Sequence, residues 1–438
     1  MKFYQKISLF LLFIFLAVCA IAQAEVKFTP GVDLRIRHEF WKNITDVENQ
    51  SKDNRNYFRT RYRFSGDLQF SDSVDIYTRL TDEFKDYTYY PNSQKGLKFD
   101  INETVIDNLY LGVKNFAGLP VNMRFGRQDL LGQYTDGFLI ADGTPLDGSR
   151  TMYFNAAQLS FHPNETNIVD FVYINDPKDD SFLPIINRMD GNQALNQTDE
   201  IGYLLDWKNS FWKNSSFETY YIYKTEDDDG GKLAQAQNSN IHTLGVFNRY
   251  EFDKSLALRT QFAYQTGSYG DYERQGWGGY VFADKTFDMQ FSPKLCAGVI
   301  LLSGDDPNTN TNEGWDPLFS RYPWMSELYN QSYNNETGTA YWTNLRMYRT
   351  QLQLALTKKA KLTAMYNYLQ AMDNPPASAT IAFGSGKNRG HLPGLRLDYA
   401  FNKNVSAYVM GEYLIPGNYY DKASDPSLFT RVELLFKF

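Results

Sequence analysis

Hydrophobic and polar residues alternate along most of this 438-residue chain. In residues 32–40, the apolar Val32, Leu34 and Ile36 alternate with charged residues at positions 33, 35, 37 and 39. Successive side chains of a strand point to opposite faces, so this segment would present one apolar and one charged face. The pattern predicts a strand whose apolar face could meet lipid.

Three arginines occupy one face of the next predicted strand, near residues 57–70. Arg59, Arg61 and Arg63 alternate there with less polar residues such as Tyr62. A soluble sandwich shows the same alternation of apolar and polar faces, so one strand does not separate a sandwich from a membrane barrel.

The lengths of the connections between strands separate these two folds. Short turns are predicted at 71–73, 118–120, 162–166, 209–215, 252–255, 292–293, 357–360 and 401–404, and long connections at 175–199, 226–240, 267–275, 304–340, 373–387 and 416–427. Alternation of short and long connections is typical of a transmembrane barrel, with short periplasmic turns and long extracellular loops. Greek-key crossings of a sandwich give no reason for it. The sequence therefore predicts an all-β, antiparallel, up-and-down transmembrane barrel of about eighteen strands.

The C-terminal segment is also an alternating strand. Val432, Leu434 and Phe436 share one face with the terminal Phe438, while Arg431 lies on the other face. A terminal Phe on such a strand resembles the signal by which outer-membrane barrels are assembled. The apolar face of this strand is predicted to meet lipid.

Composition agrees with a barrel. Tyr and Phe number 32 each, and aromatic residues make up 16% of the chain; both strands and membrane-interface girdles favour such residues. The mean hydropathy of −0.49 argues against a helical membrane protein. It is compatible with strands that alternate apolar and polar residues.

Residues 1–24 are predicted to be a secretory signal peptide. Lys2 and Lys6 precede an apolar segment, and an Ala-Gln-Ala sequence ends at position 24. A lipoprotein site at Cys19 is disfavoured by the bulky Val18 before it. The mature chain, 25–438, would form one barrel domain in which Cys296 is the only cysteine. An intrachain disulfide would then be impossible.

The net charge gives no support for nucleic-acid binding. It is −7 for the whole chain and becomes more negative without the two lysines of the signal peptide. Beyond position 24 the sequence has no apolar run long enough for a membrane-spanning helix.

A barrel of this size encloses an aqueous lumen, so the inward-facing residues would carry the function. Arginine forms bidentate pairs with carboxylates and stays charged at any physiological pH. For a single arginine, the favoured interpretation is that it pairs with a nearby acid and braces the wall. Where basic residues outnumber acids locally, the favoured interpretation is an electropositive path for an anionic solute. The candidate pore residues are Arg35, Arg37, Arg59, Arg61, Arg63, Arg124, Arg127, Arg150, Arg249 and Arg346.

Two sequence blocks resemble the alginate-export family of bacterial outer-membrane barrels. The first runs from Arg124 to Arg150, with GRQ at the end of a strand and DGSR closing a loop, and the second comprises residues 303–307 and 315–319. The resemblance implies a channel for an anionic polysaccharide such as alginate, most plausibly leaving the cell. It implies outer-membrane lipid and periplasmic polysaccharide machinery as partners. On the motif, Arg127 and Arg150 are the first candidate pore residues, followed by Arg61, Arg59 and Arg124.

Two other functions remain open at this stage. An uptake porin for small carboxylates or anionic oligosaccharides would use the same basic wall. An outer-membrane enzyme or adhesin is less favoured, because enzymatic barrels tend to be narrower and the sequence shows no nucleophile, base and oxyanion pattern. The long segment 304–340, rich in Trp and Tyr, is predicted to fold over or into the mouth as a gate.

Other candidate chemistry is weak. Asp306, Asn308 and Asn310 place oxygen ligands at alternate positions, as calcium loops do, but Thr311 and Pro317 stand where an EF-hand needs glycine and glutamate. A solvated loop is the favoured interpretation, with calcium as the alternative. The sequence at 384–387 lacks the remaining residues of a phosphate-binding loop, and the four histidines show no metal-binding spacing. No other cofactor is expected.

Overall fold

The computed structural model describes residues 26–438 except 45–46, 48–53, 90–98, 102, 145–149, 187–195, 197, 228–237, 322–324, 333–340, 375–382 and 422–423. The predicted signal peptide lies outside the described residues, as do the first three residues of the DGSR segment. No helix among the described residues is long and apolar enough to cross a membrane.

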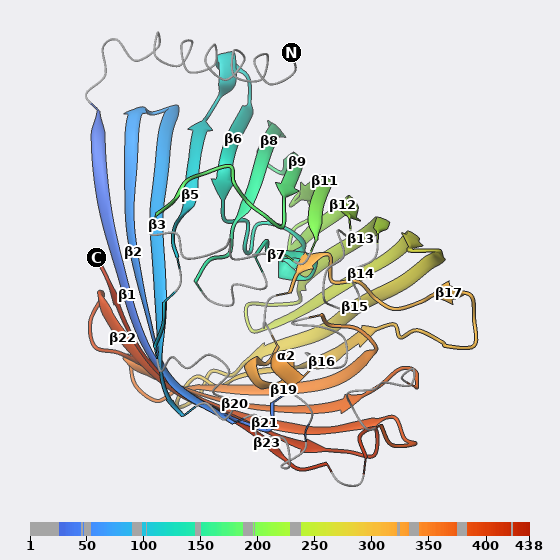
Figure 1. Ribbon diagram of the computed structural model, residues 1–438. Helices are drawn as coiled ribbons and strands as arrows, with labels where there is room; N and C mark the ends of the chain where they lie inside the picture. Colours follow the sequence, from blue (N-terminus) through green and yellow to red (C-terminus); the bar gives the residue numbers. More distant parts are fainter. Residues whose placement is uncertain are drawn as a thin grey trace.

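Eighteen antiparallel strands form one closed barrel, as predicted. The wall strands are β1 (Lys27–Lys42), β2 (Arg55–Ser71), β3 (Val74–Tyr89), β5 (Thr104–Val113), β6 (Val121–Gln128), β8 (Phe154–Asn164), β9 (Asn167–Asp176), β11 (Asp199–Asn209), β12 (Ser215–Asp227), β13 (Ser239–Glu251), β14 (Leu256–Tyr269), β15 (Tyr272–Thr286), β16 (Lys294–Leu302), β19 (Leu345–Ala355), β20 (Ala360–Gln370), β21 (Asn388–Ala400), β22 (Val405–Pro416) and β23 (Ser427–Lys437). Each pairs with its neighbours in sequence order, and β1 pairs with β23, from Asp33 opposite Lys437 to Lys42 opposite Leu428. This last pairing closes the wall and leaves no open edge (Figure 1).

The faces of the strands agree with the predicted alternation. Val32, Ile36 and Val432 are 40%, 37% and 48% exposed on the outer surface, whereas Arg35 and Glu39 on the intervening positions are buried inside. Apolar side chains outside and charged side chains inside are the reverse of a soluble domain and are typical of a barrel in lipid.

The predicted connections are confirmed with one exception. The segment 267–275, predicted as a long connection, is instead a tight hairpin: β14 ends at Tyr269, and β15 begins at Tyr272. Gly270 makes the turn possible with a φ of 57°, a conformation that costs glycine little. These two strands therefore continue beyond the loops beside them. The strict alternation in loop length fails here because a strand pair that reaches past the membrane needs no long loop.

Short elements lie within the connections. They are β4 (Phe99–Ile101), β7 (Ile140–Asp142), β10 (Ile185–Ile186), β17 (Thr311–Asn312), β18 (Phe319–Ser320), α2 (Glu327–Ser332) and the 3-10 turns η2 (Phe116–Gly118) and η3 (Thr135–Gly137). β4, β10 and β17 extend the main sheet at its loop end. β7 and β18 pair only with each other, in parallel, and Figure 1 shows β7 and α2 enclosed by the barrel wall.

Candidate functional site

Six arginines lie together on the inner face of β1, β2 and β3. This arginine ladder comprises Arg35, Arg37, Arg59, Arg61, Arg63 and Arg79. The antiparallel register places Arg35 directly opposite Arg61 and Arg37 directly opposite Arg59. Like charges directly opposite each other are destabilising, so the ladder requires nearby carboxylates.

Glu83 of β3 is shared by two arginines of the ladder. Its Oε1 accepts a hydrogen bond from Arg59 Nε at 2.6 Å, and its Oε2 accepts one from Arg35 Nη2 at 2.8 Å. The carboxylate is fully buried. One acid thus offsets two cations from neighbouring strands, and charge-assisted hydrogen bonds of this kind are the stronger class.

Glu39 forms a second shared centre nearer the extracellular end of β1. Its Oε1 accepts from Arg431 Nε at 2.8 Å, and its Oε2 accepts from the Tyr57 hydroxyl at 2.8 Å. Arg37 and Arg59 lie 3.8 and 3.9 Å from the same carboxylate. Arg431, on the last strand, therefore joins the ladder across the seam where the barrel closes.

The other arginines of the ladder each have a carboxylate partner. Arg61 Nη2 donates to Asp33 Oδ1 at 2.9 Å, and Arg37 donates to Glu433. Asp107 of β5 lies 2.8 Å from Arg79 and 3.7 Å from Arg63. The side chains of Arg37, Arg63 and Arg79 keep 12%, 12% and 15% of their surface exposed, so they are the ladder positions most open to a solute.

Arg124 and Arg249 face the lumen outside the ladder. Arg124 of β6 lies over the ring of Tyr110 at 4.7 Å. Arg249 lies near the end of β13, where its Nε is 3.2 Å from Glu251 Oε1. Both side chains lie toward the short-turn end of the wall, which is the periplasmic end in barrels of this kind.

The two arginines predicted from the family motif do not line the pore. Arg150 is completely buried and Arg127 is 4% exposed. Arg127 binds Asp180 at 2.5 Å, the carbonyl of Ile106 at 2.8 Å and the ring of Tyr153. The expectation that they are the first residues of the pore is therefore wrong.

Hydrogen bonds show what Arg127 and Arg150 do instead. Arg150 donates to the carbonyl of Glu103, and its own carbonyl accepts from Arg63 at 2.6 Å. The residues before strand β8 are thus tied to β2 and to the start of β5. The two guanidinium groups hold the loops against the inside of the wall. Arg127 does so by binding the carboxylate of Asp180, and Arg150 by binding the carbonyl of Glu103.

Arg346 is the second correction. Tyr348 and Leu352 on the same face of β19 are exposed on the outer surface, so Arg346 shares the outward face. The inward arginine of this strand is Arg349, which donates to the carbonyl of Met325 at 2.8 Å. The inward positions Leu345 and Met347 are apolar because they pack against the loops inside the barrel, so the rule that apolar residues face outward gives the wrong face here.

The two family-like blocks meet in the lumen and form a plug, which we define as residues 130–142, 315–321 and 325–330. β7 of the first block pairs with β18 of the second, and Ser320 Oγ donates to the carbonyl of Gly137. The Phe138 ring lies 5.0 Å from the ring of Trp315. The apolar residues around 138–140 are buried in this contact, which explains their place in an otherwise polar loop. The prediction that the segment 304–340 folds into the mouth is thereby supported for its described residues.

Glycines in the wall make room for the plug. A Cβ at Gly278 would lie 2.7 Å from the Trp315 ring, and a Cβ at Gly202 would lie 2.6 Å from the Phe319 ring. Both glycines face inward on β15 and β11. A side chain at either position would push an aromatic anchor of the plug away from the wall.

Several ion pairs join the plug to the wall. Asp316 lies 3.4 Å from Arg274, Arg321 lies 3.3 Å from Glu226, and Glu327 of α2 lies 2.5 Å from Arg431. Burial raises the pKa of Asp316 and of Glu327, but the arginines outweigh it and hold both values below their ordinary range. Both carboxylates are thus ionised partners at neutral pH, and they couple the plug to β15 and β23.

The segment predicted as a possible calcium loop binds to itself. Asp306 Oδ1 accepts from the backbone N–H and the side-chain amide of Asn308, at 3.0 and 2.8 Å. Among the described residues, no group of three or more His, Cys, Asp or Glu side chains is arranged to hold a metal ion. Calcium binding at Asp306, Asn308 and Asn310 stays a prediction.

Sequence reasoning missed Arg431, Arg274 and Arg321, which take part in ion pairs between wall and plug. Arg431 lies on the charged face of the terminal strand, so the alternation of apolar and charged residues in that strand indicated that it would face inward. Arg321 lies inside a long loop, and no local pattern indicated that it would be buried against β12.

Comparison with known proteins gives a family and a fold. Residues 26–432 match the family described as alginate export. No curated protein matches the chain. Among solved structures, Acinetobacter baumannii OccAB1 superposes with a TM-score of 0.60 at 11% identity, covering 95% of this chain and 99% of that one.

Two Pseudomonas aeruginosa proteins are similar to the same degree. OccK2 (OpdF), solved in complex with glucuronate, gives a TM-score of 0.58 at 10% identity and covers 94% of this chain and 98% of its own. The outer membrane protein opdK gives 0.58 at 9% identity, with the same coverage. At these identities the likeness shows the fold, an outer-membrane porin barrel.

Proposed function

Because the chain belongs to the alginate-export family and forms a β-barrel of the bacterial outer membrane, we propose that it is a diffusion channel for anionic saccharides that carry uronate carboxylates. The arginine ladder is the observation that carries this proposal. On β2 the ladder extends from Arg59 to Ser65, the residue opposite Arg79, which is about 20 Å along the strand. A passing chain of uronates would meet the exposed edges of Arg37, Arg63 and Arg79, with the more buried arginines adding positive charge behind them.

The pairing of each arginine with an acid suits conduction rather than tight binding. A solute carboxylate can take the hydrogen bond that an arginine donates to Asp33 or Glu433, so one charge-assisted hydrogen bond replaces another. The displaced carboxylate then loses its cation, and this cost keeps the binding of the solute weak. Conduction requires several sites that bind well enough to admit a solute and weakly enough to release it. Shared acids such as Glu83 would prevent the track from holding a polyanion.

The substrate class rests on two supports. The family is described as alginate export, and alginate is a polyuronate. A structural neighbour was solved in complex with glucuronate, which is a single uronate. Both carry the carboxylate that a planar guanidinium binds in a bidentate way.

The plug favours a second candidate function, the uptake of small carboxylates or short anionic oligosaccharides. Its aromatic anchors fill part of the lumen and are buried against the wall. A narrow path admits a monosaccharide more readily than a bulky polymer. Flux of glucuronate and of uronate oligomers of increasing length into proteoliposomes separates the two: a cut-off at one or two units favours uptake, and passage of long oligomers favours export.

The proposal is tested by ion selectivity in planar bilayers. Arg37→Gln with Arg63→Gln removes two of the more exposed cations of the ladder, and we expect a lower anion preference in the reversal potential and weaker current block by polyuronate. The electrostatic part of the block should fade between about 0.1 and 1 M salt, as the screening length falls from about 10 to 3 Å. Arg346→Gln is the matched control, because that arginine faces outward.

The following results would contradict the proposed channel function. A wild-type channel that prefers cations, or a double variant with unchanged selectivity and block, would show that the ladder braces the wall and does not guide the solute. A barrel that conducts no ions would contradict both the export and the uptake candidates.

A further inference from the structure

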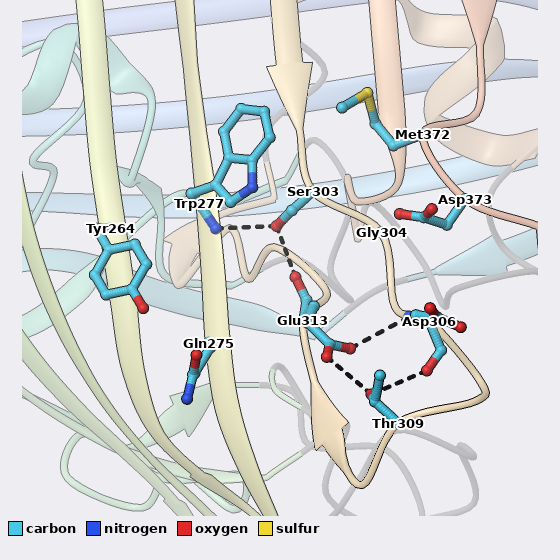
Figure 2. Close-up of a pocket in the computed structure, with 10 residues that line it drawn as sticks. All are labelled: Tyr264, Gln275, Trp277, Ser303, Gly304, Asp306, Thr309, Glu313, Met372 and Asp373. Atoms are coloured by element: carbon cyan, nitrogen blue, oxygen red, sulfur yellow. Dashed lines mark hydrogen bonds between the residues drawn. The ribbon is translucent and has the colours of Figure 1, made fainter.

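A pocket of about 440 Å³ lies on the outer surface of the barrel, at the loop end of β14 and β15. The wall supplies Tyr264, Gln275 and Trp277 to its lining, and the loops supply Asp306, Glu313 and Asp373 (Figure 2). Tyr264 and Trp277 are directly opposite each other in the strand pairing. They point away from the lumen, because they share their faces with the exposed Phe262 and Val281.

Aromatic side chains also lie on the outer face of the strands beside the pocket. Gln275 is in register with Thr266, which is in register with His242, Tyr223 and Tyr203 on the next strands. The rings of Tyr223 and His242 stack at 4.6 Å. Rows of aromatic side chains mark the membrane–water boundary of such barrels. A molecule bound in the pocket would sit on this outer face, outside the lumen.

Exposed leucines share this outer face on β11 and β13. Leu244 and Leu205 lie one step further along their strands from the loop end, and they are 64% and 52% exposed. Exposed leucines are typical of the lipid-facing band of such barrels.

Hydrogen bonds hold the loop side of the pocket in place. Ser303 Oγ accepts from the backbone N–H of Trp277 at 2.9 Å and donates to the carbonyl of Glu313 at 2.7 Å. Glu313 in turn accepts from Thr309 Oγ1 at 2.8 Å and from the backbone N–H of Asp306 at 3.3 Å. Figure 2 shows these bonds linking the loop to β15. The lining is thus formed before any ligand arrives, which lowers the cost of binding.

We propose that this pocket binds an uncharged hexose unit. The rings of Tyr264 and Trp277 offer an apolar surface of the size of a sugar's C–H face. Gln275 and the carboxylates of Asp306, Glu313 and Asp373 offer acceptors for hydroxyl groups. The same carboxylates repel a uronate, so the preference of this pocket is opposite to that of the arginine ladder.

The sugar can come from two sources, a glycolipid head group in the outer leaflet or a free saccharide at the cell surface. Both present the same hydroxyl groups to the pocket. The inference does not depend on the proposed channel function, because none of the pocket's wall residues faces the lumen.

Saturation-transfer NMR on the full-length protein in detergent tests the proposal with maltose and glucuronate as probes. We expect a signal from maltose that falls by about fivefold in Trp277→Ala, the loss of one aromatic contact of about 1 kcal/mol. Trp277→Phe should restore part of it. Tyr348→Ala, which removes an exposed outward aromatic residue elsewhere, should leave the maltose signal unchanged. Ion conductance of Trp277→Ala should equal that of the wild type.

Each outcome of the NMR experiment either supports or contradicts the proposed sugar site. A maltose signal that is absent, or equal in the wild type and Trp277→Ala, overturns the proposal, as does a stronger Trp277-dependent signal from glucuronate. Loss of the maltose signal when purified lipopolysaccharide is added assigns the pocket to a glycolipid head group, and persistence of the signal assigns it to free saccharide. If Trp277→Ala changed the ion conductance but not the binding of maltose, Trp277 would act in the channel. That result would also contradict the proposed sugar site.

Discussion

At the scale of single residues, burial decides what each arginine can do. Arg63 keeps an exposed edge in the lumen, whereas Arg127 and Arg150 are enclosed by partners. A guanidinium that already binds a carboxylate, a carbonyl and an aromatic ring offers no face to a passing solute. The residues that the family motif singles out therefore hold loops, and the residues that alternate along the first strands face the path.

Arg127→Gln is expected to destabilise the protein without changing its selectivity. It leaves Asp180 buried without its cation, a change that typically costs about 3 to 5 kcal/mol. Equilibrium unfolding in detergent measures the loss, with Arg346→Gln, expected within about 0.5 kcal/mol of the wild type, as the control. If Arg127→Gln kept full stability and lost anion preference, the motif-based assignment to the pore would be right after all.

At the scale of elements, the plug is held by charges as well as by aromatic packing. Glu327 on α2 faces Arg431, with Arg37 and Glu39 nearby, and Asp316 faces Arg274 and the hydroxyl of Tyr341. A carboxylate whose pKa is lowered by folding stabilises the folded arrangement above its ordinary pKa. That contribution is lost as the pH falls below the ordinary value.

Acidification is therefore expected to loosen the plug. The stabilisation declines once the pH falls below the ordinary pKa values of 4.5 for Glu327 and 3.8 for Asp316. The ion pairs themselves are lost at still lower pH, where the folded carboxylates protonate, and amide hydrogen exchange in α2 should then accelerate. Glu327→Gln should show faster exchange already at neutral pH and a smaller pH response. Asp253→Asn, at a distant periplasmic turn, should behave like the wild type. Equal exchange in Glu327→Gln and the wild type would mean that packing alone holds α2.

At the scale of the whole molecule, closure and the lipid face decide stability. The pairing of β1 with β23 removes the free edges of the sheet, and a barrel without edges resists unravelling. The outer surface carries apolar side chains on alternate positions of the wall strands. Because the strand period is two residues, a shift of one position would exchange the lumen and lipid faces.

An arginine on the lipid face tests this register. Val432→Arg, near the middle of β23, is expected to cost about 2 to 4 kcal/mol because it places a charge in hydrocarbon. Gln69→Arg, on an inward position of β2, is expected to be tolerated. Unfolding free energies and the mobility of unheated samples in gels give the comparison. An inverted pattern of tolerance would mean that the faces are exchanged.

The sequence alone determined the architecture. A two-residue period in the strands and the lengths of the connections are local properties, and they predicted the strand number, the lipid face of Val32 and Val432 and the inward face of Arg59, Arg61 and Arg63. The hairpin at Gly270 was missed because a connection's length depends on where its strands end above the membrane.

Only the tertiary structure decided how the long loops fold and which charges they cover. The joining of Ile140 to Phe319 and the burial of Arg150 arise from contacts between segments far apart in the chain. Arg346 was assigned to the wrong face for the same reason. Its neighbours Leu345 and Met347 are apolar because they pack against the plug. The sequence period shows that one face of a strand is apolar, but not whether lipid or protein covers that face.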